Sequence, residues 1–309
     1  MARSLWKRQG LMSAMEQNKM IWIYREDRLC EAPFLLDALG LMPLGDSGRQ
    51  EASSGGPMGF PVVSAVGAGG KTTTLRRLAE EFVQQGQRAV VTTTTHILEE
   101  NKPYFYRGTP DAGFPAGLSR MREAARTFLC EIRKNLDRFG QVWTGMPASG
   151  GKLGSLPEAF VEQLWTLGVP VLIEADGARK MPLKVPAGHE PVLHPQTTHV
   201  LSVYGLDAVG ERLEDVCFRK ELAEKLLRKN GTERVTAGDI ALFAASPRAG
   251  RKGCPEGAAY TVVLNKADNT RRKEDALAIC RELKKRGIPR VVVTSYPDSR
   301  EKDNREKKA

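Results

Sequence analysis

The sequence has few of the features that mark secreted, membrane-spanning or zinc-binding proteins. It holds five cysteines among 309 residues, and no two of them form a C-x-x-C pair, which argues against a disulfide framework or a zinc knuckle. No apolar run approaches the roughly 18 residues that a membrane span needs. The N-terminal apolar stretch is broken by Gln9, Glu16 and Lys19, unlike a secretory signal. We therefore expect a cytoplasmic protein without a membrane partner.

Aromatic residues are also scarce, at 6%, although the formal net charge is +10. Residues 270–309 hold 13 Lys and Arg against 7 Asp and Glu, so much of the positive charge lies near the C-terminal end. Proteins that bind nucleic acid usually show a basic patch within a recognisable module, and the sequence contains no such module. Nucleic acid is therefore not the expected partner, and residues 298–309 are predicted to be a disordered basic tail.

The chain alternates short apolar runs with helical patterns. The apolar runs predict strands at residues 62–66, 89–91, 171–173, 199–204, 260–264 and 290–294. Nearly continuous apolar strands are typical of a parallel sheet that is covered on both faces. The expected fold class is therefore α/β, with a P-loop NTPase-like, mostly parallel sheet and helices on both faces. Residues 1–59 are predicted to be a partly disordered appendage and linker, and residues 60–297 the nucleotide-binding domain.

The segment A-V-G-A-G-G-K-T, residues 65–72, joins the first predicted strand to a helix. It offers the parts of a phosphate-binding loop: glycines for the cradle, Lys71 for the β- and γ-phosphates, and the Thr72 hydroxyl for Mg²⁺. Ala65 stands where the strict pattern has glycine, and a Gly-rich turn with an incidental lysine is the alternative. The residues expected to bind the phosphates are Gly67, Ala68, Gly69, Gly70, Lys71, Thr72 and Thr73.

The segment N-K-A-D follows the predicted strand at residues 260–264 and resembles the guanine-recognition motif of GTPases. Asp268 can accept hydrogen bonds from N1 and the exocyclic amine of guanine, whereas adenine presents an acceptor at N1. Asn265, Lys266 and Asp268 are therefore the expected base-binding residues, and GTP is favoured over ATP. Asn and Asp also often begin helices, which is the alternative interpretation.

The segment E-A-D-G, residues 174–177, resembles the acidic strand end of P-loop NTPases. Asp176 is expected to hold Mg²⁺ together with Thr72, and Glu174 to polarise the attacking nucleophile. Lys71 and Glu174 are thus the candidate catalytic residues. The alternative is a salt-bridged strand end, with Arg179, Lys180 or Lys184 as the partner.

Two further patterns bear on the predicted site. Thr94 or Thr95, in the run T-T-T-T-H, could contact the γ-phosphate or Mg²⁺, although the preference of threonine for strands explains the run as well. His189, His194 and His199 recur every five residues, a spacing that places them on one face of neither a helix nor a strand. We therefore expect no metal site from these histidines.

Taken together, four strings in this order resemble the YqeC family of accessory proteins for selenium-dependent molybdenum hydroxylases. The strings are V-G-A-G-G-K-T-T-T, T-T-T-T-H-I, E-A-D-G-A-R-K-M-P-L-K-V-P-A-G-H-E-P and L-N-K-A-D, and the resemblance spans most of residues 34–296. It implies a role in maturing the selenium-containing cofactor of molybdenum hydroxylases. The implied partner is such an enzyme or one of its maturation factors.

Three functions fit these observations. The favoured one is a Mg²⁺-dependent NTP hydrolase that uses GTP or ATP in cofactor maturation. The second is an ATP-dependent ligase, because G-A-G-G-K-T-T-T resembles the G-T-N-G-K-T-T-T loop of Mur-type ligases. The third is a non-catalytic, nucleotide-gated chaperone for selenium or the cofactor, with candidate carriers at Cys130, Cys217, Cys254 and Cys280.

Overall fold

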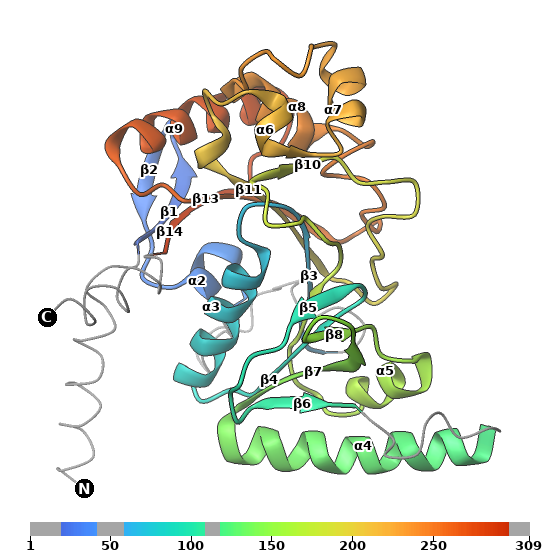
Figure 1. The fold of residues 1–309 in the computed structure, drawn as a ribbon. Coiled ribbons are helices and arrows are strands. Elements are labelled where there is room, and N and C mark those ends of the chain that lie inside the picture. Colours follow the sequence, from blue (N-terminus) through green and yellow to red (C-terminus); the bar gives the residue numbers. More distant parts are fainter. Residues whose placement is uncertain (1–19, 42–58, 109–117, 297–309) are drawn as a thin grey trace, which may run out of the picture.

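A computed structural model describes residues 20–41, 59–108 and 118–296 (Figure 1). The strands are β1 (Met20–Arg25), β2 (Arg28–Glu31), β3 (Val62–Gly67), β4 (Ala89–Thr93), β5 (His96–Leu98), β6 (Phe105–Arg107), β7 (Gln141–Ala148), β8 (Lys152–Gly154), β9 (Val171–Glu174), β10 (Leu183–Lys184), β11 (His199–Gly205), β12 (Cys217–Phe218), β13 (Ala259–Asn265) and β14 (Val291–Ser295). The helices are α2 (Leu35–Leu39), α3 (Lys71–Gln84), α4 (Leu118–Phe139), α5 (Glu158–Trp165), η1 (Leu206–Ala208), α6 (Leu213–Val216), α7 (Lys220–Leu227), α8 (Ala237–Ala245) and α9 (Thr270–Lys285). The predicted tail at 298–309 lies outside the described residues.

One large sheet organises the molecule, in the order β2-β1-β14-β13-β11-β3-β9-β4-β7-β8-β5. Every pairing from β14 across to β7 is parallel. The strands in this part are buried on both faces, as in the fully buried pattern of β4 and β11, which explains why their sequences are continuously apolar. The prediction of a mostly parallel α/β sheet is confirmed.

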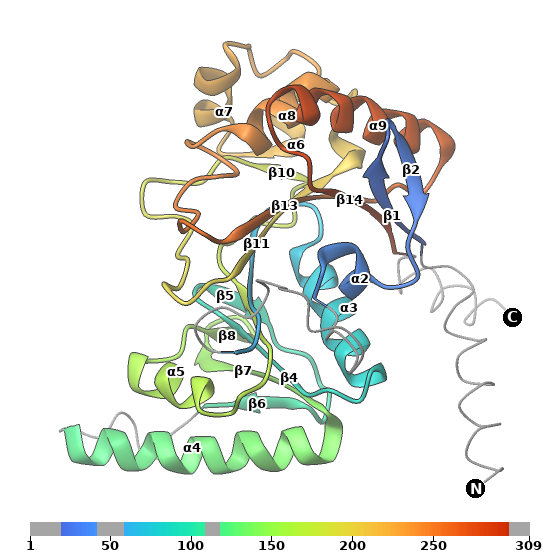
Figure 2. The same cartoon turned by 180° about the vertical axis from the view of Figure 1, so that it is seen from behind.

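Helices cover both faces of the sheet (Figures 1 and 2). On one face, α2 and α3 bury leucines such as Leu36 and Leu75 against β3, β4 and β9. On the other face, α4 and α5 cover one half of the sheet, and α8 and α9 cover the other half. Within the described residues, no helix is long and apolar enough to cross a membrane.

Residues 20–41, which fall within the predicted appendage and linker at residues 1–59, pack against β14 and α3. β1 pairs antiparallel with β14, so that Met20 lies opposite Ser295. Leu36 on α2 is fully buried, and its amide donates to Oε2 of Glu81 on α3 at 2.9 Å. Residues 20–41 are therefore an integral part of the sheet and its core. The remaining residues of the predicted appendage and linker, 1–19 and 42–58, lie outside the described residues.

Candidate functional site

The predicted phosphate-binding segment forms a tight turn between β3 and α3. Gly67, Gly69 and Gly70 have φ angles of 89°, 78° and 136°, which residues with side chains rarely adopt. A Cβ atom on Gly70 would lie 2.1 Å from Nδ2 of Asn265, and one on Gly69 would lie 2.2 Å from the amide nitrogen of Gly205. The turn therefore requires glycine, because groups from neighbouring strands pack directly against it.

The backbone amides of this turn fall into two groups. The first three amides are hydrogen-bonded within the protein. The Gly67 amide donates to Asp176 Oδ2 at 3.0 Å, the Ala68 amide to the Val203 carbonyl at 2.9 Å, and the Gly69 amide to the Met181 carbonyl at 3.1 Å. The second group, residues 70–73, begins α3, whose N-cap at Gly70 makes no side-chain capping bond. Helix geometry leaves such amides without intrahelical partners. With the helix dipole, they favour an anion at this position.

Lys71 begins α3 and is 4% exposed. Its Nζ atom donates to the Gly67 carbonyl at 2.7 Å and lies 3.0 Å from Oδ1 of Asp176. It also lies 4.0 Å from Oε1 of Glu174. The ammonium group thus lies beside the turn, between the carboxylates of Glu174 at the end of β9 and Asp176 two residues later.

Glu174, at the end of β9, lies beside Thr72. The Thr72 hydroxyl donates to Oε2 of Glu174 at 2.6 Å, whereas Thr73 in the same helical turn is exposed. Burial raises the pKa of Glu174, and Lys71 and the Thr72 hydrogen bond oppose that shift. The structure therefore places Glu174, and not the expected Asp176, next to the hydroxyl that would ligate a metal.

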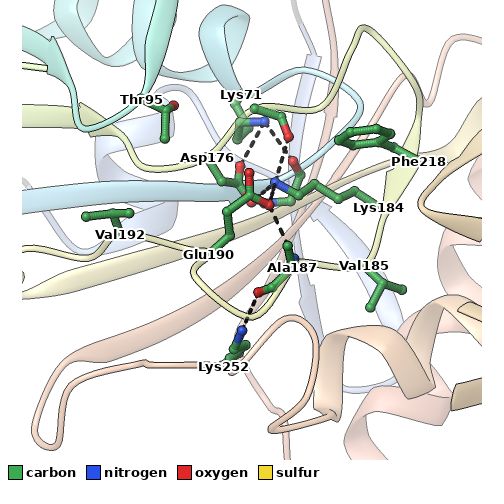
Figure 3. A network of polar contacts seen from close by, with 12 residues as sticks. Lys71, Thr95, Asp176, Lys184, Val185, Ala187, Glu190, Val192, Phe218 and Lys252 are labelled. Atoms are coloured by element: carbon green, nitrogen blue, oxygen red, sulfur yellow. Dashed lines mark hydrogen bonds and ion pairs between the residues drawn. The ribbon is translucent and has the colours of Figure 1, made fainter. Parts of the chain in front are cut away.

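Asp176 lies among cations. Its Oδ2 atom is 3.0 Å from Nζ of Lys184, while Oδ1 faces Lys71 (Figure 3). Of the cations considered as alternative partners, Arg179 stacks its guanidinium 4.9 Å from the centre of the Phe218 ring. Lys184 is the cation among the three that pairs with Asp176. The sequence therefore indicated the ion pair but not which residue forms it.

The predicted base-binding segment lies at the end of β13, where it contacts the glycine-rich turn between β3 and α3. Nδ2 of Asn265 donates to the Gly69 carbonyl at 2.9 Å, and its Oδ1 accepts from the Thr294 hydroxyl at 3.0 Å. The ammonium group of Lys266 pairs with Asp207, just after β11. One buried amide side chain therefore joins β13, β14 and the turn after β3.

Asp268 is held in place but remains 42% exposed at its side chain. Its Oδ1 accepts from the Ser295 hydroxyl at 2.7 Å, and its Oδ2 lies 3.1 Å from Nη1 of Arg272. Thr294 and Ser295 were not among the predicted site residues. Thr294 is the last residue of the predicted strand at residues 290–294 and Ser295 follows it, and their partners lie almost thirty positions earlier.

The threonine run ends β4 and enters a short turn. The Thr93 hydroxyl donates to the Glu174 carbonyl at 2.8 Å, and the Thr94 hydroxyl donates to the Val192 carbonyl at 2.8 Å. The Thr95 amide donates to the Thr93 hydroxyl at 3.0 Å. These bonds tie the end of β4 to the end of β9, so Thr95 lies at the same edge of the sheet as Asp176 (Figure 3).

The remaining candidates do not form a site of their own. No group of three or more His, Cys, Asp and Glu side chains suited to a metal occurs in the described part of the chain. His199 is buried, and this burial, with the nearby charge of Arg290, lowers its pKa to about 4. Cys217 and Cys280 are buried, and burial raises the pKa of each thiol to about 12.

The parallel sheet, with the glycine turn between β3 and α3 and the acidic end of β9, defines an α/β protein of the P-loop NTPase-like class. The chain belongs to the YqeC family, whose pattern, described as "YqeC protein", matches residues 63–221. It is 30% identical over 208 residues to the uncharacterized protein YqeC of Escherichia coli (strain K12). The aligned region covers 66% of this chain and 75% of the E. coli protein. The family match includes the turn, Glu174, Asp176 and Lys184, and it ends before Asn265.

Proposed function

We propose that this protein binds a guanine nucleotide with Mg²⁺ and hydrolyses its terminal phosphate. The observation that carries the proposal is the Asn265 side chain, which bonds the Gly69 carbonyl within the phosphate-binding turn and the Thr294 hydroxyl beside Ser295. The N-K-x-D segment is therefore attached to the turn and does not merely begin a helix. A nucleotide with its phosphates on α3 would extend its base towards Asp268.

The chemistry of Asp268 favours guanine. Its carboxylate is oriented by Ser295 and remains accessible, so it can accept from the N1–H and the amine of guanine. Adenine would present an acceptor to an acceptor, and an unsatisfied polar pair in a desolvated site costs about 1–3 kcal/mol. ATP is therefore expected to bind more weakly than GTP.

The donor set at the turn suits magnesium. Mg²⁺ is usually held by one or two protein oxygens together with phosphate oxygens and water, and Thr72 with Glu174 supplies such a pair at 2.6 Å. When bound, the ion would neutralise charge on the transferred phosphoryl group. Lys71 would bind the β- and γ-phosphates, and Glu174 would orient water at the metal. The geometry thus favours Glu174 over Asp176 for the metal role.

A nucleotide panel tests this proposal. Calorimetry should show Mg²⁺-dependent GTP binding to the wild type, with weaker ATP binding, and Lys71→Ala should abolish hydrolysis. Asp268→Asn replaces an acceptor oxygen with an NH₂ donor, which matches the C2 carbonyl of xanthine. This variant should therefore lose GTP affinity and gain XTP affinity. Equal binding of GTP and ATP by both proteins would overturn the base assignment, and no nucleotide binding at all would overturn the function.

The pathway is proposed on family membership. We infer that nucleotide turnover serves maturation of the selenium-containing cofactor of a molybdenum hydroxylase. The ligase alternative predicts ADP formation only with an acceptor and leaves the Asn265 contacts unexplained. The chaperone alternative requires a reactive thiol, and the raised pKa values of Cys217 and Cys280 disfavour both as carriers. Stoichiometric selenium labelling that a single Cys130→Ser or Cys254→Ser change blocks would favour the chaperone.

A further inference from the structure

A buried ion network extends from the phosphate-binding turn into the segment after β9 (Figure 3). Lys184 is fully buried, and its ammonium group has three partners: Asp176 Oδ2 at 3.0 Å, Glu190 Oε2 at 2.8 Å and the Gly177 carbonyl at 2.6 Å. Glu190 also pairs with Nη1 of Arg219 at 2.6 Å. The ammonium group of Lys184 is therefore surrounded by acceptors, as a buried charge requires.

Asp176 pairs with its two lysines through different oxygen atoms. Its Oδ2 atom accepts from the Gly67 amide and pairs with Lys184. Its Oδ1 atom is buried and makes no hydrogen bond within the described structure, although Lys71 Nζ lies 3.0 Å away. The two lysine contacts are equally long, at 3.0 Å. Lys71 begins the helix whose N-terminal amides favour an anion, so its pair with Asp176 is the one that bound phosphates would compete for.

Loss of Lys71 to phosphates would leave Asp176 charged in a site where it is 1% exposed. An unpaired buried charge is strongly destabilising. A second cation already in contact removes this cost, because Asp176 keeps Lys184 and the Gly67 amide. Without Lys184, Asp176 would hold Lys71 more tightly and oppose its transfer to the phosphates.

We propose that Lys184 is a positioning residue that releases Lys71 from Asp176 for phosphate binding. The inference rests on the proposed function and extends it, since the network has no direct role in base recognition or metal binding. A purely structural ion pair would stabilise the fold equally with and without nucleotide. The proposed role instead couples Lys184 to the phosphates that Lys71 contacts.

Lys184→Met removes the charge while keeping the length of the side chain. We expect the variant to bind GTP and GDP about tenfold more weakly than the wild type, a factor within the usual range for coupled sites. Its affinity for GMP should be unchanged, because GMP carries no β- or γ-phosphate for Lys71. Fluorescence competition with each nucleotide measures these affinities. An equal loss for GMP, or no loss for GTP, overturns the proposal.

A double-mutant cycle with Asp176→Asn sharpens the test. In the Asp176→Asn background, Lys71 no longer faces a buried charge, so adding Lys184→Met should leave GTP affinity the same as in Asp176→Asn alone. Equal losses in both backgrounds would show a structural effect only and would overturn the proposal.

A third variant decides the matter if thermal unfolding shows that Lys184→Met does not fold. Glu190→Gln leaves Asp176 as the one carboxylate paired with Lys184 among the described residues, so it should tighten GTP binding severalfold. Unchanged or weaker binding overturns the inference. If the wild type binds GTP and all variants bind it with the same affinity, only the role of Lys184 is disproved. If the wild type binds no nucleotide, the proposed function and the role of Lys184 are disproved together.

Discussion

At the scale of single residues, close backbone packing decides the shape of the glycine-rich turn between β3 and α3. Gly70 combines a φ of 136° with a neighbour, Asn265, that leaves no room for a Cβ atom. Sequence alone indicates the turn because glycine, lysine and threonine stand at fixed spacing. It does not show that an amide from β13 packs against the turn, since that contact depends on the order of strands in the sheet.

Gly70→Ala should damage both stability and nucleotide binding. Alanine at this φ costs about 1–3 kcal/mol, and its Cβ would displace Asn265 from the turn. Chemical denaturation should therefore show a lower free energy of unfolding, and GTP titration should show lost affinity. Gly188→Ala is the matched control, because its added Cβ meets nothing within 4 Å and Gly188 has no positive φ. A Gly70→Ala protein that behaves like the control would contradict this account.

Residue roles also show what sequence could and could not reveal about the site. Lys71, Thr72, Asn265 and Asp268 were predicted as site residues because each belongs to a short motif. Ser295 was not, because its role comes from a contact with Asp268 across 27 positions. Side chains that orient a motif residue from another strand carry no local pattern.

At the scale of elements, the hairpin β1–β2 and helix α2 show the limit of periodicity. The strand M-I-W-I-Y-R is apolar at consecutive positions because both of its faces are largely covered, so it lacks the alternation of a half-exposed strand. Helix α2 has five residues, too few for a helical period to stand out. The strands β3, β4, β9, β11, β13 and β14 were predicted because each is a continuous apolar run within an alternation of strands and helices. The strands β5, β6, β7, β8, β10 and β12 were not predicted.

Leu36→Ala tests whether α2 belongs to the core. Leu36 is 0% exposed, and truncating a fully buried leucine typically costs about 2–5 kcal/mol. Urea unfolding should show this loss in a single transition that also includes the P-loop domain. Leu98→Ala on β5 serves as the control, since Leu98 is 56% exposed and should change stability by less than about 0.5 kcal/mol. A separate early transition for α2 would contradict the integral packing.

At the scale of the whole molecule, the order of strands brings distant motifs to one edge. β11 lies between β3 and β13, and β9 lies on the other side of β3. The carboxyl ends of parallel strands share an edge, so the turn after β3, the acids after β9 and the segment after β13 converge. The alternation of elements predicted the parallel sheet. It did not predict this order, which depends on packing between elements far apart in the chain.

The buried network makes stability sensitive to acid. Burial opposes ionisation of Glu190, but the hydrogen bonds from Arg219 and Lys184 outweigh it and lower the pKa from 4.5 to about 2. A carboxyl group with a lowered pKa in the folded state stabilises the fold above its unfolded pKa, and this contribution is lost as pH falls from about 4.5 to 2. Unfolding measured across this range should therefore show a steeper loss in the wild type than in Glu190→Gln.

The control for this pH series is Glu282→Gln. Glu282 pairs with Lys285 on the solvent side of α9, and solvent screens such pairs. Its substitution should leave the acid slope close to that of the wild type. If Glu190→Gln and Glu282→Gln show the same slope, the network around Lys184 does not control acid stability.

The antiparallel pairing of β1 with β14 has a practical consequence for expressing this protein in pieces. A chain shortened to begin at residue 60, where composition suggests a boundary, would leave one side of β14 without its backbone partners. Unpaired strands of this kind recruit other chains and aggregate. The same shortening would remove Met20, which pairs with Ser295. Weak guanine binding by such a fragment would therefore be an effect of the truncation and would not measure the affinity of the intact protein.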